Sequence, residues 1–166
     1  INAQCEGFPG KTIEGAKPTS HYVPRFRNIH KQETDFLRGY AAGFGASPAR
    51  ETDLRGFGAT LKKQLLETKE TGVWNVNSHM MGETIPKESN QVTLDKEKVD
   101  SWGIPLLNIN VDYDENDEKM IQDFFEQFTE MFKKAGFVNI KTNDNKRMPG
   151  NDIHEMGGVR MGKDPK

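Results

Sequence analysis

The residues with the clearest potential for chemistry stand near the end of the sequence, where a histidine precedes a glycine-rich turn. His154 is followed by Gly157 and Gly158, and Arg160 stands six residues after it. Adjacent glycines let a backbone approach a ligand closely, within contact distance of a planar ring. A histidine pKa lies near neutrality, so an imidazole placed by such a turn is suited to proton transfer. These features leave two interpretations open: a catalytic histidine, or a surface loop whose arginine binds a structural carboxylate.

Two blocks of the sequence resemble one enzyme family. His-Glu-Met-Gly-Gly-Val-Arg-Met-Gly at 154–162 is similar to the C-terminal signature of the glucose–methanol–choline (GMC) oxidoreductases, a histidine followed by a Gly-Gly or Gly-Thr turn and Arg-Met-Gly. Gly-Glu-Thr-Ile-Pro-Lys-Glu-Ser-Asn at 82–90, with a short strand at 91–94 and Trp-Gly-Ile-Pro at 102–105, resembles the pyranose-oxidase branch of that family. The blocks stand in the expected order, and together they are specific.

The resemblance implies a reaction and a set of roles. GMC enzymes bind FAD and oxidise an alcohol or sugar hydroxyl to a carbonyl, with hydride passing to the flavin. It implies that His154 accepts the hydroxyl proton, and that Gly157 and Gly158 lie where the backbone approaches the flavin. The acceptor that takes the electrons from the reduced flavin has three alternatives: oxygen, a quinone or a cytochrome subunit.

Five further residues are candidate contacts for a sugar or polyol substrate. In the pyranose-oxidase branch an arginine that faces the sugar stands three residues before the glycine of the second block, and here that position is His79. Arg25, Arg27 and Asn28 belong to a stretch expected to be a strand that could line the pocket. Asp152 stands two residues before the catalytic candidate. The alternatives are a partly exposed strand histidine and arginines that are solvated or structural.

The other functional parts of the family are expected outside this sequence. In this family the FAD-binding fingerprint lies far upstream of the region that resembles 1–166. The second catalytic histidine or asparagine, followed by Asn-Pro, lies downstream of it. We therefore expect 1–166 to be a single substrate-binding domain with the histidine loop at 150–164. Its FAD-binding domain would belong to the same polypeptide, and the isolated piece would neither hold FAD tightly nor turn over. The alternative is a non-catalytic carbohydrate-binding or interaction module that keeps the loop.

Other motifs for phosphate or metal binding fail on the residues they require. Gly-Lys-Thr at 10–12 would need a glycine where Cys5 stands, and Gly43 and Gly56 each begin a dinucleotide fingerprint that lacks its third glycine. The acidic stretch 112–117 mimics a calcium loop but has no glycine at its sixth position. A single cysteine allows neither an internal disulfide nor a cysteine-based zinc site. No metal site is therefore predicted.

The bulk composition narrows the class of partner. The 166 residues carry a formal net charge of -2 without a basic stripe, which argues against nucleic acid. No run of about 18 apolar residues exists, so no membrane-spanning helix is predicted. A mean hydropathy of -0.79 is polar for a free-standing globule and suits either a folded module with long surface loops or a piece that packs against another domain.

The hydrophobic pattern predicts an α+β fold, with a largely antiparallel sheet of about six strands and helices packed on one face, as in the GMC substrate-binding domain. The residues 1–20 are expected to be loop, and the expected strands are 21–29, 38–46, 71–82, 91–95, 106–113 and 137–141. One helix is expected over about 53–69. A clearer helix is expected to start after the N-cap Asp114, to bury a phenylalanine face and to close at Gly136.

Overall fold

The fold is a mixed arrangement of seven strands and two helices in the part of the chain that the structure describes. The computed structural model describes residues 2–9, 20–48, 56–67, 73–145, 153–154, 156–159 and 161–162. In chain order the elements are β1 (Asn2–Pro9), β2 (His21–Val23), β3 (Tyr40–Pro48), α1 (Ala59–Glu67), β4 (Val73–Gly82), β5 (Gln91–Val99), β6 (Pro105–Asn110), α2 (Glu115–Lys134) and β7 (Val138–Asn143). The α+β class predicted from the sequence is confirmed, but of the two described helices only α2 packs on a face of the sheet, whereas both were expected there.

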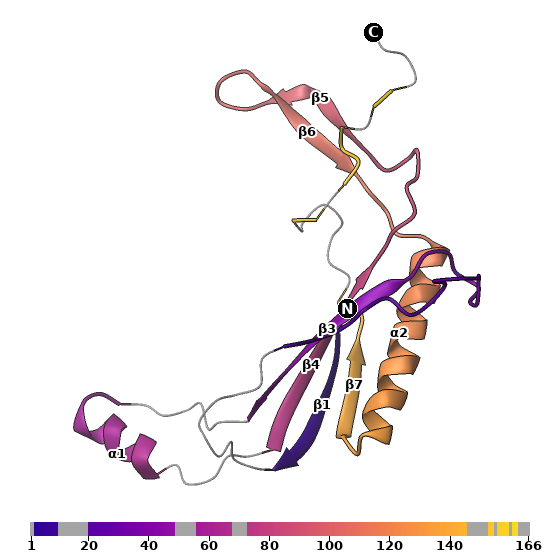
Figure 1. Ribbon diagram of the computed structural model, residues 1–166. Helices are drawn as coiled ribbons and strands as arrows, with labels where there is room; N and C mark the ends of the chain where they lie inside the picture. The colour runs from indigo at the N-terminus through magenta and orange to yellow at the C-terminus, as the bar shows by residue number, and fades with distance from the viewer. Residues whose placement is uncertain are drawn as a thin grey trace.

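The strands form one main sheet and one separate ribbon. The main sheet has the order β2-β3-β4-β1-β7, and β5 and β6 pair with each other alone. Every one of these pairings is antiparallel. Figure 1 shows α2 lying along one face of the main sheet, with the β5–β6 ribbon projecting beyond one end of the sheet and α1 beyond the other.

Helix α2 is defined by strong local signals at both of its ends. The side chain of Asp114 accepts the backbone N–H groups of Asn116 at 2.9 Å and Asp117 at 3.3 Å. In return the carboxylate of Asp117 accepts the backbone N–H of Asp114 at 3.0 Å, which completes a capping box. Acidic residues fill the first turn, and Lys133 and Lys134 stand in the last, so both ends complement the helix dipole.

The core lies between α2 and the sheet. Met120, Phe124, Phe128 and Phe132 recur on one side of the helix, and each is at most 3% exposed. They pack against inward residues of β3 and β4 and the loop before β3, namely Phe36, Tyr40, Ala42 and Val76. Each buried phenylalanine contributes roughly 1.5–3 kcal/mol relative to exposure. Because side chains alternate along a strand, this packing also decides which residues of β3 and β4 face away from the helix.

Three predictions about the sheet are wrong: the loop over 2–9, the extent of the strand over 21–29 and the number of strands in one sheet. The residues 2–9 were expected to be loop, yet β1 pairs with both β4 and β7. A strand with a partner on each side is stabilised by that pairing, which its own residue pattern does not reveal. The strand expected over 21–29 ends at Val23, because Pro24 lacks the N–H that would continue the ladder. The main sheet has five described strands rather than about six, because the strands expected over 91–95 and 106–113 pair with each other apart from it, while β1 is added to it.

Replacing Asp114 by alanine should lower the Tm of the protein by a few degrees, because α2 loses the acceptor for two backbone N–H groups. Asp114→Asn is the matched control, since asparagine caps a helix about as well but loses the charge that faces Lys87 at 3.5 Å. Differential scanning calorimetry measures both variants. An equal loss of Tm in the two variants would assign the effect to the Lys87 pair and contradict the capping account.

Candidate functional site

The face of the main sheet that α2 leaves uncovered is lined by polar side chains and bare backbone. Three exposed residues of β4 point to this face, and their register partners on β3 are small: Asn75 opposite Ser47, Asn77 opposite Gly45, and His79 opposite Gly43. Their neighbours Val76 and Ser78 are buried on the other side. We call this surface, made by these six residues, the open face.

His79 lies against the backbone of the neighbouring strand. A Cβ atom built on Gly43 would stand 2.5 Å from Cε1 and 2.7 Å from Nε2 of the His79 imidazole. The His79 ring therefore occupies the space that the Cβ atom of any residue other than glycine at position 43 would fill. The register also places Tyr22 of β2 on the far side of Gly43, where its side chain is 64% exposed.

A compact loop, 24–39, joins β2 to β3 and is organised by Asn28. The Asn28 amide donates to Thr34 Oγ1 at 2.8 Å and to the carbonyls of Phe36 and Arg38 at 2.9 Å each. Its side-chain oxygen accepts the backbone N–H groups of Glu33 at 2.8 Å and Thr34 at 3.2 Å. Asn28 itself has a φ of 52°, a left-handed conformation that asparagine tolerates better than most residues. The side chain of Asn28 is thus engaged in holding its own loop.

Arg25 and Arg27 fix this loop to the rest of the fold. Arg25 donates to the carbonyls of Arg27 at 3.0 Å and Asn28 at 2.7 Å, and its guanidinium lies 3.8 Å from the Glu83 carboxylate. Arg27 forms a two-point pair with Asp123 of α2, with distances of 3.0 and 2.7 Å. The loop is therefore bound to the helix by a paired charge that is mostly buried.

Tyr40 completes the same network from the start of β3. Its hydroxyl donates to Asp123 Oδ2 at 2.7 Å. Burial, followed by this hydrogen bond, raises the pKa of the Tyr40 hydroxyl well above its usual value, so the hydroxyl is a neutral donor at any physiological pH. The hydrogen bond to Asp123 likewise raises the pKa of Arg27. One carboxylate thus joins the loop, the sheet and α2.

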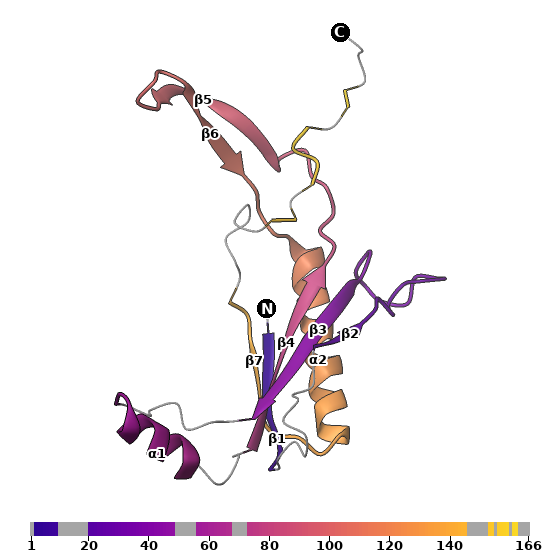
Figure 2. The same ribbon diagram turned by 60° about the vertical axis from the view of Figure 1, so that its left-hand side comes forward.

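The histidine loop lies apart from these residues and is strongly exposed. Gly157 has a φ of 89°, which strains any residue with a side chain, and a Cβ built on Gly157 or Gly158 would meet nothing within 4 Å. His154 is exposed beside them. Both views show the described parts of this loop on the side of the molecule where β5–β6 projects (Figures 1 and 2). A planar group can therefore approach this backbone without displacing any described atom.

Apolar side chains of the same loop are also uncovered. The exposed fractions are 85% for Ile153, 94% for Met156, 101% for Val159 and 96% for Met161. Four apolar side chains so close together are costly to leave in water. The described part of the chain does not supply the surface that would bury them.

The predicted site residues thus fall into separate groups. Arg25, Arg27 and Asn28 come together, but in a loop rather than a strand, and with their donors engaged by the protein itself. His79 lies on the open face, and His154 belongs to the exposed loop with Gly157 and Gly158. Asp152, like Arg160 of the motif, lies outside the described residues.

Sequence reasoning missed the open face, although a signal for it was present. In β4 the polar residues at 75, 77 and 79 alternate with Val76, Ser78 and Met80, which indicates one polar face and one face toward the core. It also missed Asp123, which nothing in the sequence distinguishes from the other acidic residues of α2.

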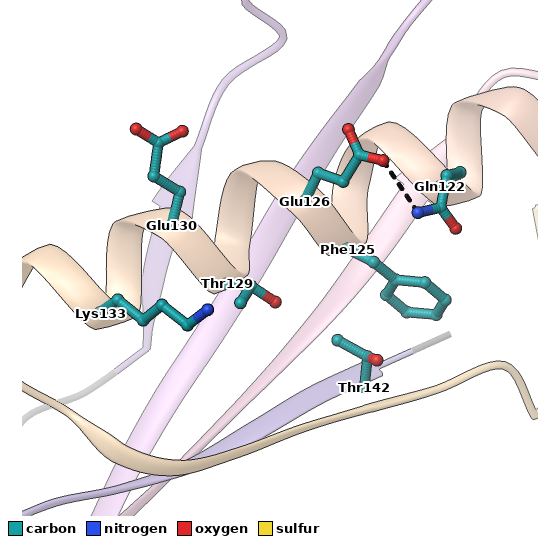
Figure 3. Close-up of a pocket in the computed structure, with 7 residues that line it drawn as sticks. All are labelled: Gln122, Phe125, Glu126, Thr129, Glu130, Lys133 and Thr142. Carbon is teal, nitrogen blue, oxygen red and sulfur yellow. Dashed lines mark hydrogen bonds between the residues drawn. The ribbon is translucent and has the colours of Figure 1, made fainter.

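Two hollows in the described surface carry no recognisable chemistry. Figure 3 shows the larger, of about 450 Å³, between α2 and Thr142 of β7, where Gln122 donates to Glu126 at 2.9 Å. The second, of about 380 Å³, lies beside the Arg27–Asp123 pair.

The described residues contain no group of three or more His, Cys, Asp or Glu side chains placed to hold a metal ion. None of the described helices combines the length and apolar character needed to cross a membrane.

Comparison with known proteins gives two similarities. The residues 86–166 match the family model described as GMC oxidoreductase. The chain is also similar to the 2-methyl-1,2-propanediol dehydrogenase of Mycolicibacterium austroafricanum, with 33% identity over 147 residues. That alignment covers 80% of this chain and 25% of the dehydrogenase, so the chain spans about a quarter of the length of this relative.

Replacing Asp123 by asparagine should reduce the free energy of unfolding by about 2 kcal/mol, because Arg27 and Tyr40 keep their buried donors but lose the charged acceptor. Urea unfolding followed by circular dichroism measures the change. Glu130→Gln is the control, since it removes a carboxylate from the same helix that pairs with Lys134 at the surface. Equal midpoints for the two variants would contradict the role assigned to Asp123.

Proposed function

We propose that this chain, whose residues 86–166 carry the C-terminal domain of the GMC oxidoreductases, is the substrate-binding part of an FAD-dependent oxidoreductase that oxidises a CH–OH group of a sugar or polyol to a carbonyl. The observation that carries the proposal is the histidine loop at 154–162, which lies inside the matched range. The similar protein is by name a dehydrogenase of a diol, which supports a hydroxyl-bearing substrate.

In this proposal His154 is the proton acceptor. A neutral imidazole has a nitrogen that can take the proton of a substrate hydroxyl. No hydrogen bond from the described residues engages the nitrogens of His154. When bound, FAD supplies the acceptor for the hydride. Gly157 and Gly158 fit the approach of its planar ring, because the space beside their backbone is open.

The open face is the proposed surface for the substrate, with His79 as its principal contact. Sugars and polyols present hydroxyl groups that both donate and accept hydrogen bonds. Amide side chains such as Asn75 and Asn77 do the same, and a neutral imidazole has one donor and one acceptor nitrogen. These three side chains are exposed on one face of β4. Arg25, Arg27 and Asn28 contribute by shaping the adjoining loop through their hydrogen bonds within the protein.

His154→Ala in the full-length protein should slow the reduction of the flavin by substrate about a hundredfold or more, because the hydroxyl loses its proton acceptor. Anaerobic stopped-flow absorbance of the flavin measures this rate. His30→Ala is the matched control, since His30 is also an exposed loop histidine but lies in the 24–39 loop. Reduction at the wild-type rate in His154→Ala would rule out the base assignment.

The chain 1–166 on its own should not retain FAD, because the motif that binds the ADP and pyrophosphate groups is missing from its sequence. The purified chain is mixed with FAD and desalted, its helix content is checked by circular dichroism, and its flavin absorbance is recorded. A folded, yellow preparation after desalting would contradict this expectation.

A further inference from the structure

We infer that Gly43 is a positioning residue that leaves room for one edge of the His79 imidazole to rest against β3, and so sets the orientation in which this imidazole meets a substrate hydroxyl. The inference rests on the proposed function, because that function makes His79 a substrate contact. Gly43 itself is not a substrate contact and acts through His79.

The distances show why this position needs a glycine. A Cβ on Gly43 would stand 2.5 Å from Cε1, 2.7 Å from Nε2 and 3.4 Å from Nδ1 of His79. Carbon atoms that are not bonded attract best at about 3.5–4.0 Å, so the two shorter separations are strongly repulsive. The atoms in the way belong to the end of a side chain rather than to backbone. An alanine at 43 would therefore move the imidazole and leave the sheet in place.

A second glycine on the same strand and face provides the comparison. Gly45 stands two residues after Gly43, and a Cβ built there would meet nothing within 4 Å. Gly43 is buried, whereas Gly45 is half-exposed. The pairing partner opposite Gly45 is Asn77, and the partner opposite Gly43 is His79. Of these two positions, only Gly43 has a side chain resting on its backbone.

The contact fixes how the imidazole is presented. The edge formed by Cε1 and Nε2 rests on Gly43, so the ring extends from β4 across to β3 instead of standing away from the sheet. The side chain is nevertheless exposed, and no described residue forms a hydrogen bond with its nitrogens. An exposed imidazole that is held by packing along this edge can bind a hydroxyl without first losing rotational freedom.

The test uses four variants of the full-length protein: Gly43→Ala, Gly45→Ala, His79→Ala and the Gly43→Ala/His79→Ala double variant. Anaerobic flavin reduction is followed against the concentration of three probes: glucose, sorbitol and 2-methyl-1,2-propanediol. For the probe that reduces the flavin, Gly43→Ala and His79→Ala should each raise the apparent Kd about tenfold, which corresponds to the net free energy of one hydrogen bond. The limiting rate should change little, because His154 is intact.

The double variant and the control decide the mechanism. If Gly43 acts only through His79, the double variant should bind no more weakly than His79→Ala alone. Gly45→Ala should raise the apparent Kd clearly less than Gly43→Ala, because no side chain rests on Gly45. Wild-type binding in Gly43→Ala, additive losses in the double variant, or an equal loss in Gly45→Ala would each overturn the inference.

A spectroscopic readout separates this inference from the proposed function. In full-length protein labelled with ¹³C at histidine Cε1, the signal of His79 is identified by its absence from His79→Ala. That signal should shift in Gly43→Ala and stay in place in Gly45→Ala. A signal that stays in place in Gly43→Ala overturns the inference. A shifted signal, with no flavin reduction by any probe in the wild type, supports the contact and counts against the proposed function.

Discussion

The packing of one helix face on one sheet face is the interaction on which the rest of this structure depends. Phe124, Phe128 and Phe132 of α2 bury themselves against Tyr40, Ala42 and Val76, and they close one side of the sheet to water. Because strand side chains alternate, the same packing commits the intervening residues of β4 to the other side. A polar surface with an exposed histidine is thus a direct consequence of where the aromatic core lies.

The charged network around Asp123 extends this helix–sheet packing to the neighbouring loop. Arg27 and Tyr40 converge on one carboxylate of α2, so the loop 24–39, the start of β3 and the helix are held as a unit. The loop also contacts the end of β4 through Arg25, Arg38 and Glu83. The open face is therefore bordered by a rigid segment, whereas the histidine loop makes its apolar side chains available to a surface that the described residues do not contain.

Local signals made α2 predictable, and non-local pairing made other features unpredictable. The N-cap at Asp114, the acidic first turn and the phenylalanine spacing are all read from neighbouring residues, and the helix begins where they indicate. The strand β1 could not be found in this way, because its stability comes from β4 and β7, far along the chain. The contact of Gly43 with His79 depends on the same kind of pairing, since only the register of β3 with β4 brings the two together.

The residues of the candidate site also divide into those that local motifs indicated and those whose contacts depend on the fold. His154 and its glycines were found from a short contiguous motif, and His79 from its distance to a second one. The arginines at 25 and 27 were candidate contacts because they belong to a stretch expected to be a strand beside the pocket, with solvated or structural arginines as the alternative. The chain instead leaves the strand at Pro24, and their guanidinium groups turn to backbone carbonyls and to Asp123.

The central claim is that the histidine loop and the open face serve one substrate cavity beside a flavin. A crystal structure of the full-length protein with FAD bound tests it most directly. The account predicts that the imidazoles of His154 and His79 face the same cavity, and that Gly157 and Gly158 lie against the flavin ring at its wall. A structure in which His154 lies on the outer surface, or in which the open face is buried away from the flavin, would contradict it.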